Sequence, residues 1–131
     1  MTIRPIQDGD YENILIKWWE DWGFPHPPPM IMLPDTGFIA YDGEIPVAAC
    51  FVYTTNSKVA WLTWLVSNKN YREKPNRRII INSLIEAVCE WAKSMGYNII
   101  YTVTNKSHAV FKDAGFIETS KNAHELIKTW D

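Results

Sequence analysis

Residues 66–116 read VSNKNYREKPNRRIIINSLIEAVCEWAKSMGYNIIYTVTNKSHAVFKDAGF, and this stretch decides the fold. It holds the end of an apolar run, a basic loop, a helical pattern, a second strand-like run and a short helical segment before Gly115 and Phe116. Apolar residues recur at helical spacing from position 80 to position 95, where Gly96 ends the pattern. The sequence therefore predicts a helix over residues 76–95 and a strand over residues 98–104.

The segment before the basic loop supplies the first strand of this unit. Residues 59–67 are mostly apolar, which is typical of a central strand covered on both faces. A strand, a helix and a further strand in succession predict a right-handed crossover, so the two strands are expected to be parallel. Upstream, Asp42-Gly43 between two apolar runs predicts a hairpin of residues 38–41 and 45–53.

The two ends of the chain complete the expected order of elements. Residues 2–6 are expected to form a strand, and Asp8 is expected to cap a helix that reaches Gly23. A short helix over residues 107–114 and two last strands, 116–119 and 124–130, follow the crossover. The order βα(α)βββαβαββ predicts an α/β (α+β) protein, one domain over residues 1–131, with a mixed sheet of about six to seven strands.

Charge and cysteine content exclude several classes of function. A formal net charge of -2 gives no overall attraction to nucleic acid or to an anionic membrane, and no apolar run approaches the length of a membrane span. Cys50 and Cys89 lack the spacing of metal ligands and are expected to be free thiols. We therefore expect a cytoplasmic protein with no metal, no nucleic-acid partner and no membrane partner.

The basic loop is the strongest functional signal in the sequence. Arg72, Lys74, Arg77 and Arg78 crowd the start of the long helix, where backbone N–H groups and the helix dipole also favour an anion. The alternative is a solvated helix start, but cations oppose the dipole there unless an anion lies between them. The pattern thus favours a phosphate site, although the loop contains no glycine.

This element order, with Tyr71-Arg72 before the long helix and Asn105, Phe111 and Gly115-Phe116 after the next strand, resembles the GNAT superfamily of acyl-CoA-dependent N-acetyltransferases. The resemblance implies a GNAT-like sheet in which the fourth strand splays from the fifth and acyl-CoA inserts into the gap. It also implies acetyl-CoA or another acyl-CoA as co-substrate and an amine acceptor, either a small molecule or a protein. A monomer or a homodimer is expected.

The same resemblance assigns the cofactor contacts. The backbone of Leu65, Val66 and Ser67 would pair with the pantetheine arm and polarise the thioester carbonyl. The loop departs from the family pattern at Pro75 and Arg77, where the family has small residues, so side-chain charge is expected to replace glycine-exposed amides. The expected cofactor-binding residues are Leu65, Val66, Ser67, Arg72, Lys74, Asn76, Arg77, Arg78, Asn105 and Phe111. For Asn105, a helix cap and a cofactor contact stay open together.

Catalytic residues are less clear from the sequence. Phe111 stands where the resemblance would place a Tyr that protonates the departing thiolate, and a phenyl ring cannot donate that proton. Packing is its expected role, and Ser107, Tyr101 or water is the alternative acid. No carboxylate occurs in residues 61–65. The candidate catalytic side chains are His26, His124, Glu125 and Ser107, for which surface exposure is the ordinary alternative.

The aromatic segment near the N-terminus is expected to contribute to acceptor binding. Trp18 and Trp22 are expected in the core, whereas Trp19, with Phe24 and His26, is expected to wall an acceptor pocket. Two functions follow from the sequence. One is an N-acyltransferase that moves an acetyl or short acyl group to an amine by direct attack. The other is a catalytically weak or inactive GNAT-fold module that binds CoA, a small anion or a protein partner.

Overall fold

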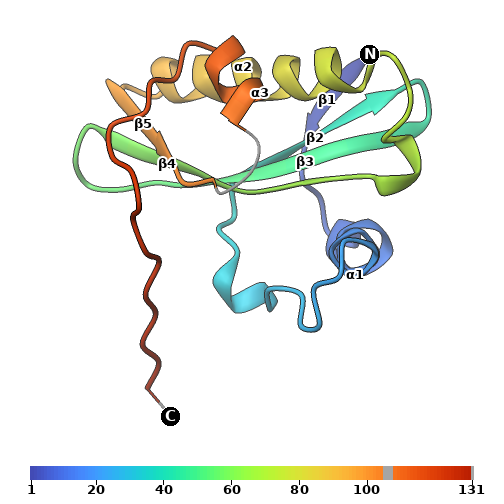
Figure 1. Ribbon diagram of the computed structural model, residues 1–131, viewed down its shortest axis with the longest axis horizontal. Coiled ribbons are helices and arrows are strands. Elements are labelled where there is room, and N and C mark those ends of the chain that lie inside the picture. The colour runs from blue at the N-terminus through green and yellow to red at the C-terminus, as the bar shows by residue number, and fades with distance from the viewer. Residues whose placement is uncertain (105–107, 131) are drawn as a thin grey trace.

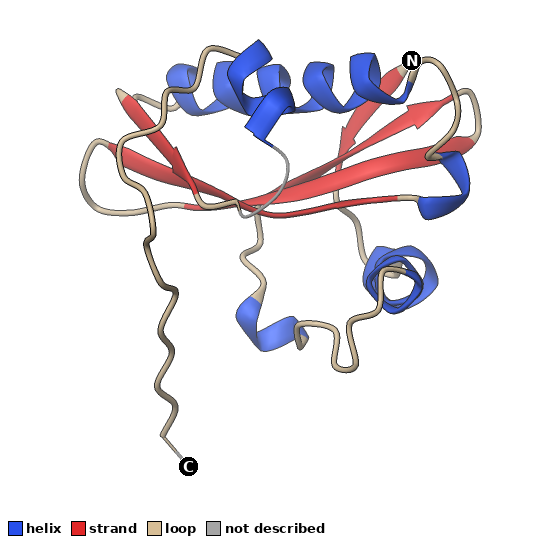
Figure 2. Ribbon diagram, viewed as in Figure 1, coloured by secondary structure: helices blue, strands red, loops and turns tan. Residues whose placement is uncertain are grey.

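The computed structural model describes residues 1–104 and 108–130, which form a twisted sheet with helices on both faces (Figures 1 and 2). Five strands of this described part pair in sequence order: β1 (Thr2–Pro5), β2 (Gly37–Asp42), β3 (Ile45–Tyr53), β4 (Val59–Ser67) and β5 (Ile99–Thr102). The first four strands are antiparallel, and β4 and β5 are parallel. The long helix α2 (Arg77–Ser94) joins them. The predicted crossover and hairpin are thus confirmed.

The two parallel strands separate after a short ladder. Their pairing runs from Val59 with Ile99 to Leu62 with Thr102. Beyond that point β4 continues along β3 alone, with Val66 opposite Ala49. Among the described residues, no strand pairs with the other edge of residues 63–67. The predicted splay between the fourth and fifth strands is therefore present.

A β-bulge marks the start of the splay. The register between β3 and β4 shifts between Ala49 and Phe51, and Trp64 has a φ of 54°. A tryptophan in this left-handed region is strained by roughly 1–2 kcal/mol and needs support from its surroundings. The Trp64 indole receives that support, because Nε1 donates to Tyr53 Oη at 3.0 Å and the ring lies edge-on to Trp19. The bulge is thus held by side chains below the sheet.

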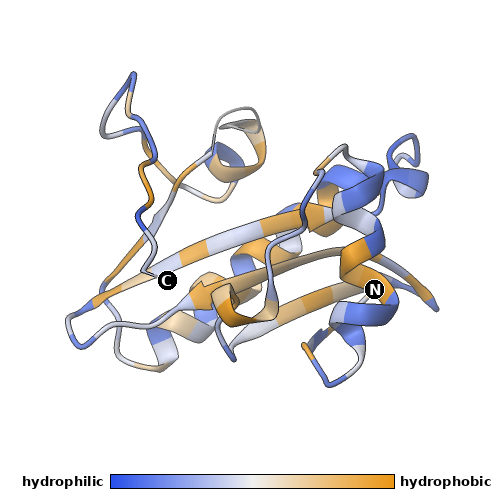
Figure 3. Ribbon diagram, turned by 90° about the horizontal axis from the view of Figure 1, so that it is seen from below, coloured by the Kyte–Doolittle hydropathy of each residue, from blue (hydrophilic) through white to orange (hydrophobic). Residues whose placement is uncertain are grey.

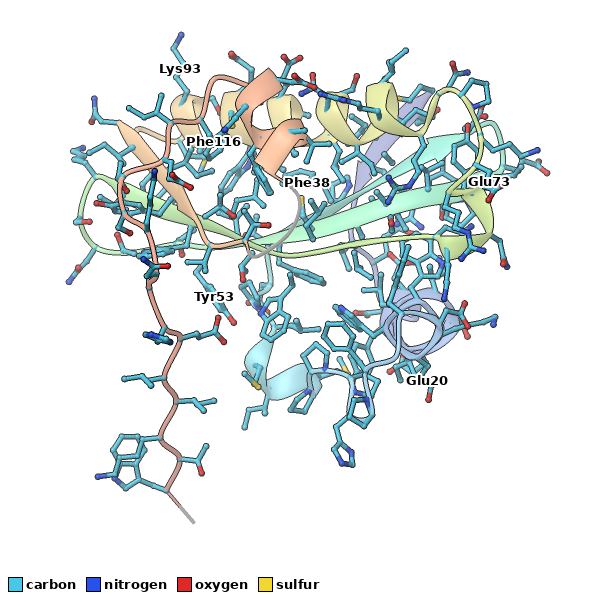
Figure 4. The ribbon with its side chains drawn as sticks, in the orientation of Figure 1. Glu20, Phe38, Tyr53, Glu73, Lys93 and Phe116 are labelled. Carbon is cyan, nitrogen blue, oxygen red and sulfur yellow. The ribbon has the colours of Figure 1, made fainter. Side chains whose placement is uncertain are left out.

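The layer above the sheet is the main hydrophobic core. Helix α2 packs on β2 and β3, and α3 (His108–Asp113) packs beside α2 (Figure 1). Phe38 lies between the sheet and α2, where its ring meets Trp91 edge-on (Figure 4). The buried members of this core are Ala40, Val47, Ala48, Cys50, Val52, Ala60, Leu62, Tyr71, Ile80, Ile81, Leu84, Ile85, Val88 and Phe111. Most of these residues belong to β2, β3, β4 and α2, and Phe111 belongs to α3.

The layer below the sheet differs from the sequence expectation in its helix boundaries and in the positions of two tryptophans. A π-helical turn, η1 (Tyr11–Leu15), leads into the short helix α1 (Ile16–Asp21), and Asp10 rather than Asp8 is the N-cap residue. Trp19 is buried against the sheet with Trp18, so it does not wall a pocket. Trp22 is the C-cap of α1 and 40% exposed, because the helix ends before it.

The C-terminal segment is the main correction to the predicted fold. Residues 116–119 and 124–130 form no strand, and the chain after Phe116 projects away from the sheet on the side of α1 (Figure 1). The expected alternation over residues 124–130 puts apolar and polar side chains on both faces, so neither face gains by packing on one sheet. The sheet accordingly has five strands in the described residues instead of six to seven.

Hydrophobic residues are concentrated in the central strands, whereas the connecting loops are mostly hydrophilic (Figure 3). Within the part of the chain that the structure describes, no helix is both long and apolar enough to cross a membrane.

Candidate functional site

The end of β4 meets the first turn of α2 at the mouth of the splay. Arg77, the first residue of α2, donates from Nη2 to Ser67 Oγ at 3.0 Å, and Ser67 is the last residue of β4. The Nε of Arg77 is buried and has no hydrogen-bond partner among the described residues. Buried donors are nearly always paired, so this N–H is available to an acceptor from outside the described residues.

The carbonyl of the same serine holds the C-terminal end of α1. Trp22 donates from Nε1 to Ser67 O at 2.8 Å. Lys69 lies over the Trp22 ring, 5.2 Å from its centroid, and donates from Nζ to Asp21 O at 3.1 Å. Sequence reasoning missed both Trp22 and Lys69, because the partners are more than forty positions apart and no local pattern joins them.

The backbone of the loop between β4 and α2 forms turns that are closed by hydrogen bonds from the loop's own N–H groups. It contains the 3-10 turn η3 (Lys69–Tyr71), and the N–H groups of Arg72, Lys74 and Arg77 each donate to the carbonyl three residues earlier. No residue of 68–76 has a positive φ, so the loop is built without the conformation that glycine provides. These three amides are therefore committed within the loop.

Tyr71 fixes this loop to the body of the protein. Its side chain is buried, and its hydroxyl donates to Asp42 Oδ2 at 2.6 Å. The hydrogen bond to Asp42, with burial, raises the pKa of the Tyr71 hydroxyl above its ordinary value. This hydrogen bond therefore attaches the loop to the end of β2.

The four cations of the loop have different surroundings. Arg78 pairs with Asp113 of α3 at 2.8 Å, and Arg72 is 4.0 Å from Glu73, whose side chain extends into solvent at the edge of the molecule (Figure 4). Lys74 is exposed and makes no ion pair in the described part of the chain. Arg77 alone is held against the splay. The predicted cluster is therefore one inward guanidinium and three outer charges.

The other residues that the sequence predicts to bind the cofactor occupy different places in the structure. Val66 and Ser67 are buried at the end of β4, and Leu65 packs against the core under α2. Asn76 is the N-cap of α2 and makes no side-chain cap. Phe111 is 5% exposed and meets Phe116 edge-on with ring centroids 5.4 Å apart. Asn105 falls outside the described residues.

The candidate catalytic side chains are not brought together by the described structure. His26 is exposed in the loop before the 3-10 turn η2 (Met30–Met32), and His124 and Glu125 are exposed on the C-terminal segment. Ser107 falls in the part of the chain that is not described. Tyr101, the alternative acid, stacks on Trp61 at 4.7 Å, one pair before the splay opens. The roles of these residues stay predictions.

Across the described ranges 1–104 and 108–130, no group of three or more His, Cys, Asp or Glu is placed to hold a metal ion. Cys50 is fully buried, and burial raises the pKa of its thiol above the ordinary value. Burial also raises the pKa of Cys89, which is half-buried on α2. Neither thiol is therefore activated as a nucleophile.

Comparisons with known proteins identify the architecture. Neither a family model nor a curated protein matches the sequence significantly. An aminoglycoside acetyltransferase from an uncultured soil metagenomic sample, in complex with trehalose, matches with a TM-score of 0.70 at 15% identity, covering 98% of this chain and 96% of that one. The structure of AAC(6')-Iy with the bisubstrate analogue CoA-S-monomethyl-acetylneamine matches with a TM-score of 0.67 at 18% identity, covering 98% of each chain.

A transcriptional regulator from Bacillus halodurans C-125 shares the fold as well, with a TM-score of 0.65 at 19% identity over 99% of both chains. Likeness at these identities shows the fold and leaves the activity open. With the β4–β5 splay and the crossover helix α2, it shows that this chain has a GNAT-like fold, the fold of these acetyltransferases.

Proposed function

We propose that the chain is an N-acyltransferase that moves an acetyl or short acyl group from acyl-CoA to an amine. The observation that carries the proposal is the contact of Arg77 with Ser67 at the mouth of the splay, where a buried guanidinium N–H has no partner among the described residues. The fold supports it at a general level, because one structural neighbour was solved with a CoA-containing bisubstrate analogue.

The residues present suit acyl-CoA in part. The edge of Leu65 and Val66 offers backbone groups to an extended pantetheine arm, as one strand offers them to another, whereas the Ser67 carbonyl already accepts a hydrogen bond from Trp22 Nε1. Arg77 offers a buried N–H, and Arg72 and Lys74 add exposed charge around the start of α2 for the phosphates. Asn76 and Arg78 complete the proposed set on the first turn of α2.

The proposed reaction is direct transfer. The neutral amine attacks the thioester carbonyl, the new C–N bond forms, the C–S bond breaks, and CoA leaves as the thiolate. The proton released from the amine passes to solvent or to a base, for which His26, His124 and Glu125 are the candidates. A covalent acyl-enzyme is not part of the proposal, because both cysteine thiols have raised pKa values and are at least half-buried.

The experiment that tests this function is release of CoA thiol from acetyl-CoA in the presence of a panel of amines, including polyamines, aminoglycosides and peptide N-termini. Amine-dependent release that falls in the Arg77→Ala variant supports an acyltransferase. Release at the rate of the uncatalysed reaction with every amine, by a protein that binds acetyl-CoA, refutes catalysis and leaves binding.

That second outcome defines the other candidate function, a module that binds CoA or a small anion without chemistry. The burial of Phe111 favours it, because a phenyl ring packed on Phe116 cannot protonate the departing thiolate. For either function we propose a cytoplasmic location, supported by the two free cysteines.

A further inference from the structure

A pocket lies below the sheet, between the turn η1 and the segment that contains η2 (Figure 1). Its volume is about 410 Å³, which is large enough for a small organic molecule. The lining residues come from segments 6–15 and 30–35 and from Phe51 of β3. None of them belongs to β4, to β5 or to the loop before α2, so the pocket is distinct from the candidate site at the splay.

The floor of the pocket is apolar and packs against the sheet. Leu15 and Phe51 are buried, and Ile6 and Leu33 are half-buried beside them. Gly37 permits this packing, because a Cβ atom at that position would lie 2.7 Å from Cδ2 of Phe51 and 2.9 Å from Cγ1 of Ile6. A side chain at position 37 would therefore displace part of the floor. The floor thus offers a preformed apolar surface to a ligand.

The rim of the pocket is acidic. Asp8, Glu12 and Asp35 line it and are exposed, and its lining includes no Lys, Arg or His. These three carboxylates have no ion-pair partner among residues 1–104 and 108–130, which the structure describes. Arg4 and Lys17, the Arg and Lys residues of segment 1–36, are already paired with other carboxylates. The rim therefore attracts a cation from solution.

Two aromatic residues, Tyr11 and Phe51, also line the pocket. Aromatic rings attract cations through their faces, and the attraction grows when the cation is withdrawn from water. The Tyr11 ring is held in place, because its hydroxyl donates to Pro28 O at 2.8 Å and the ring contacts Trp19 with centroids 6.4 Å apart. The rings and the carboxylates therefore favour the same kind of ligand, one that carries a positively charged group.

We propose that this pocket binds an organic cation, with an ammonium group at the acidic rim and an apolar chain on the floor. A metal ion does not suit the pocket, because the floor is apolar and no group of three His, Cys, Asp or Glu among the described residues is placed to hold one. An anion would be repelled by the rim, and a neutral apolar molecule would gain nothing from it. The proposal does not depend on acyl transfer at the splay.

Calorimetric titration of the full chain with hexyltrimethylammonium tests the proposal, because this cation has no N–H group and cannot accept an acyl group. Hexanoate, an anion of similar length, and tetramethylammonium, which lacks the chain, are the comparison ligands. We expect saturable binding of hexyltrimethylammonium at or below about 1 mM, and binding of either comparison ligand that is weaker by roughly tenfold or more. The proposal is overturned if hexyltrimethylammonium gives no saturable heat, or if either comparison ligand binds equally well.

Two matched double variants test where the cation binds. Glu12→Gln/Asp35→Asn removes two charges from the rim with little change in side-chain size, and Glu20→Gln/Glu44→Gln removes two exposed charges that do not line the pocket. The rim variant is expected to bind hexyltrimethylammonium about tenfold more weakly than wild type, and the control variant by less than about twofold. Circular dichroism checks that both variants fold. Equal losses of affinity in the two variants, or an unchanged affinity in the rim variant, would contradict binding in this pocket.

Discussion

Arg77 and Ser67 join the first residue of α2 to the last residue of β4 through a 3.0 Å hydrogen bond from Nη2 to Oγ. The contact explains why two adjacent arginines have different surroundings. Arg77 is drawn inward along the splay, and Arg78 turns outward to Asp113. A neighbouring pair in the sequence therefore gives a matched comparison of an inward and an outward cation.

Arg77→Ala is expected to weaken acetyl-CoA binding roughly ten- to hundredfold, because a hydrogen bond to a charged group is worth about 1.5–3 kcal/mol. Arg78→Ala is expected to weaken it by less than about fivefold, since its charge is exposed and already paired. Isothermal titration calorimetry on both variants measures the difference. Equal losses of affinity would show that the two arginines act as a general charge cluster.

Phe111→Tyr is expected to lower the free energy of unfolding by about 1–3 kcal/mol, because the added hydroxyl enlarges a side chain that is buried in an edge-on contact with Phe116. Phe24→Tyr is the matched control, since Phe24 is exposed and its variant is expected to stay within about 0.5 kcal/mol of wild type. Urea denaturation measures both. If Phe111→Tyr is as stable as wild type and speeds amine-dependent thiol release, the ring is close enough to the reaction to act as its acid.

Asp10→Asn is expected to destabilise the protein by about 1.5–3 kcal/mol at neutral pH. The Asp10 carboxylate accepts two hydrogen bonds from Arg4, at 2.8 and 3.0 Å, and one from the Gln7 N–H at 2.7 Å. The Arg4 hydrogen bonds hold the pKa of Asp10 below its ordinary value.

Because the folded-state pKa is lowered, this contribution is present above the ordinary carboxyl pKa and is lost as the pH falls toward the folded-state value. The stability difference between wild type and Asp10→Asn should therefore shrink below about pH 4. Urea denaturation of both proteins across that range measures the difference in the free energy of unfolding. A difference that stays constant with pH would show that the Asp10 carboxylate is not its cause.

The two cysteines are expected to react with an alkylating reagent at different rates, which can be tested on the wild-type protein. Cys50 is buried and its pKa is raised, so thiolate is scarce and alkylation by iodoacetamide requires unfolding. Cys89 is half-buried with a raised pKa and is expected to react slowly in the native protein. Mass spectrometry of peptides after timed alkylation separates the two. Rapid labelling of Cys50 in native protein would contradict the described core.

The centre of the fold was predictable because its signals are local. The apolar run of β4, the periodic stripe of α2 and Gly96 each lie in one continuous segment, and together they determine a parallel crossover. The prediction of two C-terminal strands was wrong for the opposite reason, because the pairing of a strand is not determined by a local signal. Alternation over residues 124–130 indicates an extended backbone but does not determine which edge receives it.

The site was less predictable because its contacts join distant segments. The π-helical turn η1 precedes α1, and α1 ends before Trp22, so a continuous helical stripe misplaced Trp19 and Trp22. Nothing near Arg77 in the sequence identifies Ser67 as its partner, and nothing near Arg78 identifies Asp113. The left-handed backbone of Trp64 is equally invisible in a sequence, because it depends on Tyr53 and Trp19.

The most direct test of the proposed function is a calorimetric titration of the wild-type protein with acetyl-CoA, using CoA and ATP as comparison ligands. We expect one saturable site per chain that binds acetyl-CoA at sub-millimolar concentration and more tightly than ATP, because the splay adds backbone contacts to the pantetheine arm. Absence of saturable heat at millimolar acetyl-CoA, with a protein that is folded by circular dichroism, would contradict an acyl-CoA site in this fold.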